Sequence, residues 1–206
     1  GVTKYNVKTN ELLYEDQGAN EVPTFPEAED NGHILFADSK DNLWYATYHW
    51  QVFRYNFKTG ITKTYQINRK HGPEYLKKEI STVLTFIQED SKRNLWFGTF
   101  DGGLLQYEAS ADTFIYHTNE IKRPGQPEYT ECPITLIADR EGGIWMGTDK
   151  GISLFHPYDV KFNSIYLSDK QAETAEYWNI MRMFQSSIGD IYISTYGQGV
   201  LIFDKN

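Results

Sequence analysis

The sequence contains a tryptophan-centred segment that recurs about every fifty residues. Three copies align without gaps, and each runs from an Asp to a Thr: Asp38–Thr47, Asp90–Thr99 and Asp139–Thr148. A fourth copy, Ser186–Thr195, has Tyr192 in place of the Trp. The spacings between successive aromatic anchors are 52, 49 and 47 residues. This regularity indicates one supersecondary unit that is copied and stacked along the chain.

Each unit has the pattern of several short strands. An apolar run such as Val83–Ile87 comes first, and turn residues such as Asp-Ser-Lys-Arg-Asn separate it from the Leu-Trp-Phe-Gly-Thr segment. A Gly-x-x-x-aromatic run such as Gly103–Tyr107 follows, and after another turn comes a β-branched and aromatic run such as Thr113–His117. Four short antiparallel strands in about fifty residues are typical of a β-propeller blade. The 3.6-residue apolar spacing of a helical repeat is absent.

The predicted fold is therefore all-β, a β-propeller or propeller segment with about four blades of four antiparallel strands. We expect one segment, residues 1–206, cut within a blade at both ends. Its predicted parts are a partial blade at 1–16, blades at 33–67, 81–118 and 133–167, and a partial blade at 178–206. The segment could form an open arc, close into a small ring, or pair its edge strands with another chain, since unpaired edges recruit partners.

Residues that recur in every unit are expected to build the blade. One Trp per blade can wedge between neighbouring sheets and exclude water. An Asp in the hairpin can accept hydrogen bonds from its own turn, and the Thr that ends the second strand can satisfy a backbone group. This structural set is Asp38, Trp44, Thr47, Asp90, Trp96, Thr99, Asp139, Trp145, Thr148, Tyr192 and Thr195.

Charge and cysteine content exclude several classes of function. The chain carries 20 basic and 28 acidic residues, a net charge of −8, which argues against nucleic acid or an anionic membrane as a partner. The single cysteine, Cys132, excludes an internal disulfide and a multi-cysteine zinc site. No apolar run approaches the roughly 18 residues of a membrane-spanning helix, so we expect no membrane contact by this segment.

The units resemble the two-component regulator propeller repeat, whose signature is approximately Asp-x-x-Gly-x-Leu-Trp-x-Gly-Thr followed by Gly-Leu-x-x-Tyr. The match covers nearly the whole chain, although Ala46 stands at the family's Gly position and Ser186 and Tyr192 replace the Asp and Trp. The resemblance implies a fragment of the periplasmic sensor region of a Bacteroidetes hybrid two-component system. In such systems the histidine kinase lies elsewhere in the protein, and the ligands are breakdown products of complex glycans.

A binding site is expected where the turns between second and third strands meet the connections between blades, because loops on a rigid scaffold carry function. Flat aromatic rings with neighbouring carboxylates, amides and cations suit the faces and hydroxyls of a sugar. The residues with this chemistry at the expected end are Tyr48, Trp50, Arg69, Tyr75, Asp101, Arg123, Tyr129 and Trp178. Alternatively, aromatic residues such as Tyr75, Tyr129 and Trp178 cap the ends of the blades.

We expect no catalytic residue, metal ion or cofactor. The sequence lacks a nucleophile elbow, a His-Glu-x-x-His helix and a P-loop, and its five histidines are scattered without metal-ligand spacing. The favoured hypothesis is a ligand-sensing module, with an oligosaccharide as its partner. The alternatives are an interaction module that contacts other blades of the parent protein or a second protomer, and a carbohydrate-active lyase or hydrolase.

Overall fold

A computed structural model describes most of the 206-residue chain. It covers residues 3–14, 32–48, 51–67, 83–100, 103–118, 132–139, 141–149, 151–156, 161–165 and 179–203. These residues form antiparallel strands and turns, with no helix among them, so no described helix is long and apolar enough to cross a membrane. The chain divides into two compact units, Gly1–Asn68 and Arg69–Asn206, which we describe separately.

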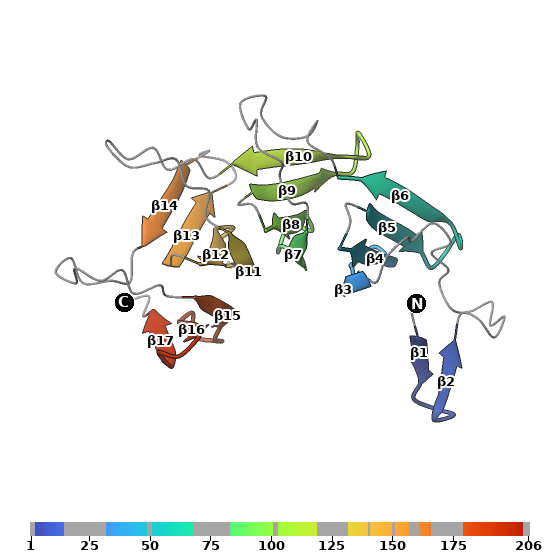
Figure 1. Ribbon diagram of the computed structural model, residues 1–206, viewed down its shortest axis with the longest axis horizontal. Coiled ribbons are helices and arrows are strands. Elements are labelled where there is room, and N and C mark those ends of the chain that lie inside the picture. The colour runs from blue at the N-terminus through green and yellow to red at the C-terminus, as the bar shows by residue number, and fades with distance from the viewer. Residues whose placement is uncertain are drawn as a thin grey trace. The chain divides into compact units, whose positions relative to one another are not determined.

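The first unit contains a hairpin and a four-stranded sheet (Figure 1). The hairpin pairs β1 (Thr3–Asn6) with β2 (Glu11–Tyr14). The first sheet has the order β3-β4-β5-β6. Its strands are β3 (Gly32–Ala37), β4 (Asn42–Thr47), β5 (Gln51–Asn56) and β6 (Thr62–Gln66).

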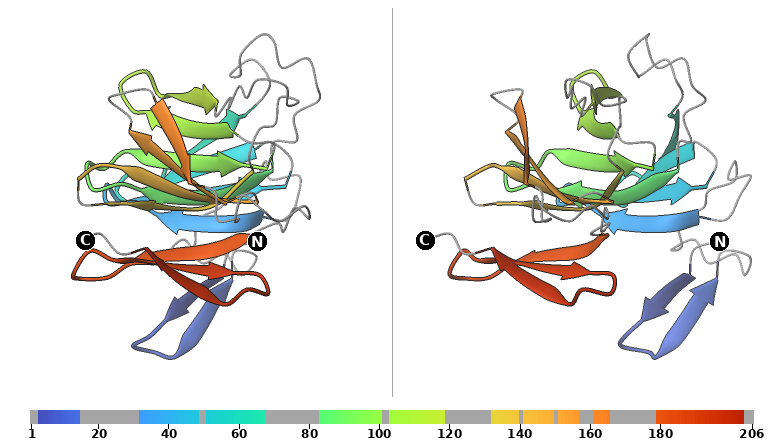
Figure 2. Two further views of the ribbon diagram at one scale, coloured as in Figure 1. Left: turned by 90° about the vertical axis from the view of Figure 1, so that its left-hand side faces the viewer. Right: turned by 60° about the vertical axis from the view of Figure 1, so that its left-hand side comes forward.

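The second unit contains three sheets, each of which follows chain order (Figures 1 and 2). The second sheet comprises β7 (Leu84–Glu89), β8 (Leu95–Thr99), β9 (Gly103–Glu108) and β10 (Thr113–Thr118). The third sheet comprises β11 (Pro133–Ala138), β12 (Ile144–Thr148), β13 (Gly151–His156) and β14 (Lys161–Ile165). The fourth sheet comprises β15 (Ile180–Gln185), β16 (Ile191–Thr195) and β17 (Val200–Phe203).

These sheets confirm the predicted all-β architecture. Each of the first three sheets has four antiparallel strands, and each strand contains or overlaps the apolar or aromatic run that predicted it. The hairpins close at the predicted Asx and Gly turns because residues there adopt positive φ, as Asp41 does at 62° and Gly142 at 89°.

The β1–β2 hairpin has the same turn as β5–β6, which makes it the third and fourth strands of a blade. The Asn6 side chain accepts hydrogen bonds from the backbone N–H groups of Lys8 and Thr9. Asn56 accepts the equivalent bonds from Lys58 and Thr59. The next residue has positive φ in both turns, 58° at Asn10 and 68° at Gly60.

In the second unit, the core lies between neighbouring sheets. One apolar cluster joins Trp96 and Leu104 of the second sheet to residues of the third sheet: Leu136, Ile144, Met146 and Phe155. The next cluster joins Trp145 and Ile152 of the third sheet to residues of the fourth: Ile180, Met183, Ile191 and Ile193. The inner strand β11 contacts both β7 and β15. Each sheet is therefore packed face to face with the next, as propeller blades are.

We call the face of a sheet that carries the repeated Trp position its wedge face and the opposite face its receiving face. In the two junctions of the second unit, a wedge face packs on the receiving face of the following sheet. The antiparallel order also gives each sheet two ends. The hairpin end holds the turns between first and second and between third and fourth strands, and the mouth end holds the turn between second and third strands.

Candidate functional site

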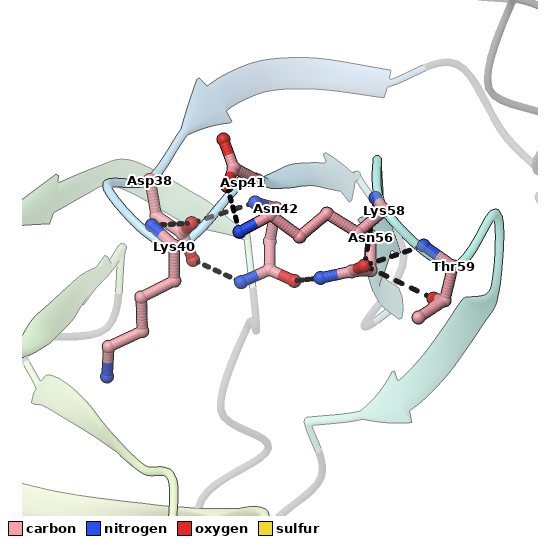
Figure 3. Close-up of polar contacts among 7 residues, drawn as sticks. All are labelled: Asp38, Lys40, Asp41, Asn42, Asn56, Lys58 and Thr59. Carbon is pink, nitrogen blue, oxygen red and sulfur yellow. Dashed lines mark hydrogen bonds and ion pairs between the residues drawn. The ribbon is translucent and has the colours of Figure 1, made fainter.

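At the hairpin end, a repeated Asp forms a hydrogen-bonded clamp on the repeated Trp. Asp38 Oδ1 accepts the backbone N–H groups of Lys40 and Asn42, both at 2.9 Å, and its Oδ2 accepts Trp44 Nε1–H at 2.8 Å (Figure 3 shows the hairpin part of this network). One carboxylate thus closes the turn and holds the indole ring of Trp44, which is fully buried.

The same clamp occurs in the next two sheets. Asp90 Oδ2 accepts Trp96 Nε1–H at 2.9 Å, and Asp139 Oδ2 accepts Trp145 Nε1–H at 2.8 Å. Each carboxylate also accepts two backbone N–H groups of its own turn. Burial raises the pKa of Asp38, but the bonds from Trp44, Asn42 and Lys40 outweigh it and lower the pKa below its ordinary value. The ionised form is the one the clamp requires.

In the first sheet the clamp continues into the neighbouring turn. Asn42 donates to Asp38 Oδ2 at 2.8 Å and accepts from Asn56 Nδ2 at 2.8 Å, so that both turns of the hairpin end are linked. Lys58 forms an ion pair with Asp41 at 2.7 Å across the same two turns (Figure 3). These polar side chains bond to one another, which favours a structural role for this end of the sheet.

The fourth sheet has lost both members of the clamp together. Ser186 replaces the Asp and Tyr192 the Trp, and the hairpin is closed by backbone bonds among Ser186, Gly189 and Asp190. The Ser186 hydroxyl is buried without a hydrogen-bond partner. Because Tyr has no indole N–H, the carboxylate has no indole to hold, which accounts for the joint replacement.

At the junctions, the clamped indoles contact aromatic residues of the next sheet. The Trp96 and Phe155 ring centroids are 5.8 Å apart in an edge-to-face arrangement, and those of Trp145 and Phe203 are 5.3 Å apart. Phe155 and Phe203 hold the same repeat position, at the end of the Gly-x-x-x-aromatic run. Repetition of this contact explains why both aromatic positions recur along the chain.

The junction of the second and third sheets also contains a histidine. The His117 ring lies 5.6 Å from Trp96 and 5.4 Å from Phe155 by centroid distance. Its Nε2 is 3.1 Å from Gln106 Oε1. Burial lowers the pKa of His117, so the neutral ring is favoured in this junction.

At the mouth end, the repeated Thr closes the turn between second and third strands. The hydroxyls of Thr99 and Thr148 donate to the carbonyls of Gly103 and Gly151, both at 3.0 Å. Thr195 makes the same bond to Gly199 at 2.9 Å, and Thr47 to Gln51 at 3.5 Å. The turn that projects from this end is therefore fixed to the sheet by its own repeat residue.

The residue immediately after this Thr is an exposed aromatic in three of the four sheets. Tyr48 is 50% exposed in the first sheet, Phe100 is 58% exposed in the second, and Tyr196 is 73% exposed in the fourth. The third sheet has Asp149 at this position. In the second unit, the mouth end thus presents an aromatic ring on each of two sheets and a carboxylate on the sheet between them in sequence.

These mouth-end positions are held by backbone bonds to the start of the inner strand. The Phe100 N–H donates to Val83 O at 2.8 Å and the Tyr196 N–H to Asn179 O at 2.9 Å. Asp149 donates in the same way to Cys132 O at 3.3 Å, and its Oδ1 accepts the Cys132 N–H at 3.0 Å. Because the backbone at these positions is already fixed, a ligand that contacts their side chains would cost little backbone conformational entropy.

All four inner strands have a register shift at this end. It lies between Gly32 and Ile34 in β3, between Leu84 and Phe86 in β7, and at the equivalent positions in β11 and β15. In β7 the residue at the shift, Thr85, donates its hydroxyl to the carbonyl of Pro133 in the neighbouring sheet. Bulges re-aim side chains and are common next to functional sites.

The structure describes only one of the residues that the sequence proposed for binding. Tyr48 is exposed at the mouth end, and its role in binding stays a prediction. The others lie outside the described residues: Trp50, Arg69, Tyr75, Asp101, Arg123, Tyr129 and Trp178. Sequence reasoning missed Phe100, Asp149 and Tyr196, although alignment of the units places all three at the position of Tyr48.

The described residues contain no group of three or more His, Cys, Asp or Glu side chains that could hold a metal ion. Within this part of the chain, the chemistry of the mouth end is that of aromatic faces and a single carboxylate. Such a set can bind a molecule that has flat apolar faces and hydroxyl groups, by stacking and by hydrogen bonds.

A search against protein-family models gave no match. Histidine kinase P4 of Formosa agariphila is 28% identical over 156 residues, which are 75% of this chain and 10% of the kinase. The chain therefore spans a small part of this relative.

Solved structures with the same fold include two of the extracellular domain of BT4673 from B. thetaiotaomicron, named a hybrid two-component system in one and a one-component system in the other. Their TM-scores are 0.68 and 0.67, and their sequence identities to this chain are 17% and 20%. The matches cover 98% and 100% of this chain, and 24% and 25% of the BT4673 chains. A virginiamycin B lyase from Staphylococcus aureus has a TM-score of 0.64 at 12% identity, over 89% of this chain and 55% of the lyase. At these identities the structures establish fold alone. They confirm the predicted propeller class, and the BT4673 domain and the histidine kinase carry names of the two-component systems that the sequence resemblance indicated.

Proposed function

We propose that this chain is a ligand-sensing module, part of the extracytoplasmic sensor region of a hybrid two-component histidine kinase and response regulator. Its location would be the periplasm, and its ligands would be glycan-derived oligosaccharides. The similarity to a histidine kinase and to extracellular domains of a two-component system supports the sensor role. A sensor needs no catalytic group, and we propose that the chain itself is not an enzyme.

One observation carries the ligand proposal: the exposed aromatic residue that recurs at the mouth end. Apolar residues that are exposed on anchored turns contribute little to folding, so their repetition indicates a binding role. Phe100 and Tyr196 can stack on the faces of sugar rings, and the free carboxylate oxygen of Asp149 can accept a hydroxyl hydrogen bond. Ligand binding would then shift a conformational equilibrium that the parent protein transmits to its kinase.

Calorimetric titration with a panel of glycan fragments tests this proposal. We expect binding by the wild-type chain, and a loss of about fivefold in affinity for Phe100→Ala or Tyr196→Ala, because one stacking contact is worth about 1 kcal/mol. Phe57→Ala is the matched control, since Phe57 at the hairpin end is an aromatic residue of similar exposure to Phe100, 53% against 58%. Equal losses in all three variants, or no heat with any fragment, would contradict the proposal. Turnover of a fragment would instead support a lyase or hydrolase.

A second candidate function is an interaction module. It is favoured by the apolar outer face of the fourth sheet, which is exposed in the part of the chain that the structure describes.

A further inference from the structure

The three mouth-end side chains of the second unit leave equivalent backbone positions on three successive sheets. Phe100, Asp149 and Tyr196 each follow the repeated Thr of their sheet. The backbone N–H of each donates to the carbonyl of the residue that precedes the inner strand of the same sheet. Because the anchors are equivalent, these side chains recur at the spacing of the sheets themselves.

The third sheet lies between the second and the fourth. Its inner strand β11 contacts both β7 and β15, and apolar clusters join it to the sheet on either side. Sheets packed face to face are about 10 Å apart, so the anchored positions of Phe100 and Tyr196 are separated by about 20 Å, with Asp149 between them. The packed cores of two junctions set this separation.

One sugar ring cannot contact both aromatic residues. A ring stacked on Phe100 lies within about 4.5–7 Å of the phenyl ring by centroid distance, far short of Tyr196. A linear oligosaccharide of several units can cover both rings at once, and its central hydroxyls then lie near Asp149. Oδ1 of Asp149 accepts the Cys132 N–H at 3.0 Å, which leaves Oδ2 to accept a hydrogen bond from a hydroxyl.

We infer that this mouth end binds a linear, neutral oligosaccharide as a bridge, with one sugar unit stacked on Phe100, another on Tyr196, and a hydroxyl between them donated to Asp149. This assignment rests on the proposed function, to which it adds the length and the charge of the ligand. Joining two contacts in one ligand makes the second contact intramolecular, so affinity rises once the chain reaches both rings. The carboxylate between the rings disfavours an acidic chain through like-charge repulsion.

Calorimetric titration with two lengths of the same glycan tests the bridge. The probes are the disaccharides and hexasaccharides of β-1,4-glucan, β-1,4-mannan and β-1,4-xylan. For a hexasaccharide that spans both rings, Phe100→Ala and Tyr196→Ala should each lower the affinity about fivefold, as expected for one stacking contact. For the disaccharide of the same glycan, each variant should lose about twofold at most, because the other ring remains available.

Three further variants separate the contributions to binding. Tyr196→Phe keeps the aromatic face and should keep the hexasaccharide affinity within about twofold. Phe57→Ala, at the hairpin end, should leave the affinities for both lengths unchanged. Asp149→Asn removes the charge and should improve binding of hexagalacturonate relative to the neutral hexasaccharides. Phe100 and Tyr196 are 58% and 73% exposed, so their variants should fold normally, which thermal unfolding checks.

The outcomes distinguish this inference from the proposed function. Equal losses for the two lengths in Phe100→Ala and Tyr196→Ala would overturn the bridge while the ligand-sensing proposal stands. Tighter binding of hexagalacturonate than of every neutral hexasaccharide by the wild-type chain would overturn the neutral class alone. The absence of binding heat with all of these probes would overturn both the bridge and the proposed oligosaccharide ligand.

Discussion

At the scale of single residues, the Asp–Trp clamp explains why Asp and Trp recur at fixed positions of the repeat. Asp90 closes its own turn with two backbone bonds and holds the Trp96 indole, which fills the junction with the third sheet. Local turn geometry and packing between sheets thus depend on the same carboxylate. This dual role explains why Asp and Trp occur together in three copies and are replaced together in the fourth.

A double-mutant cycle measures this coupling. Asp90→Ala leaves the buried indole N–H of Trp96 without its acceptor and is expected to destabilise the chain by about 1–3 kcal/mol. Trp96→Phe removes the donor and part of the junction packing, at a loss of similar size. Because both changes remove one bond, the double variant should be about 1 kcal/mol more stable than the sum predicts. Strict additivity in urea unfolding would contradict the clamp.

His117 gives the second prediction at this scale, a pH dependence of stability. Burial places its folded-state pKa below the ordinary value of about 6.5, so on acidification the unfolded chain takes up the proton first. Stability should therefore be insensitive to this residue above about pH 7 and should fall between about pH 6.5 and the lower folded-state pKa.

His117→Gln is the comparison that isolates this effect. The variant keeps all other titrating groups, so the difference between the two stability curves reports His117 alone. Urea unfolding from pH 5 to 8 should show a steeper acid loss in the wild-type chain than in the variant. Parallel curves would indicate that His117 is not desolvated at the junction.

At the scale of elements, the hairpin turns show how far sequence determines the blade. The third turn residue after the Asp has positive φ in each sheet, at Asp41, Arg93 and Gly142, and at Gly189 in the fourth. Glycine adopts this conformation without steric penalty, whereas Arg93 does so at φ 66° with a cost of about 1 kcal/mol. The clamp and the flanking strands hold Arg93 in place.

Arg93→Gly is therefore expected to stabilise the second sheet by about 0.5–1 kcal/mol, since relief of the left-handed penalty exceeds the added entropy of the unfolded chain. Arg93→Ala is the control, because alanine keeps the penalty and should give no gain. Thermal unfolding of both variants provides the measurement. A gain for alanine equal to that for glycine would mean that loss of the arginine side chain, and not backbone strain, is responsible.

The strands could be predicted from sequence because each apolar run is short, is bounded by turn residues and recurs in register with three others. The indole–carboxylate bond was not predicted, although both residues were recognised, since it joins groups six residues apart that meet only after the hairpin closes. The register shifts of the inner strands were missed for a similar reason. They depend on pairing with the second strand and leave no turn residue in the sequence.

The candidate site was harder to predict than the fold. Sequence reasoning selected Tyr48 and favoured Trp50 because it departs from the repeat, but it passed over Phe100 and Tyr196, which hold the repeat position of Tyr48. Side-chain exposure distinguishes two kinds of repeated aromatic residue. A buried one builds the sheet, and an exposed one is available to a ligand. That distinction required side-chain burial, which the repeat pattern alone does not give.

At the scale of the whole molecule, the two ends of the sheets have different tasks. The hairpin end is closed by the clamps and the linked turns of Asn42 and Asn56. In the second unit, the mouth end presents Phe100, Asp149 and Tyr196 from three successive sheets on anchored backbone. The Asp–Trp clamps thus lie at the hairpin end, and the mouth end holds the residues for which we propose a ligand-binding role.

Hydrogen–deuterium exchange with and without a glycan ligand is the most direct test of this division. Our account predicts that ligand raises amide protection in the turns that follow β8, β12 and β16, and leaves the hairpins at 38–42, 90–94 and 139–143 unchanged. Protection confined to those hairpins, or unchanged exchange at the three mouth-end turns with saturating ligand, would contradict it.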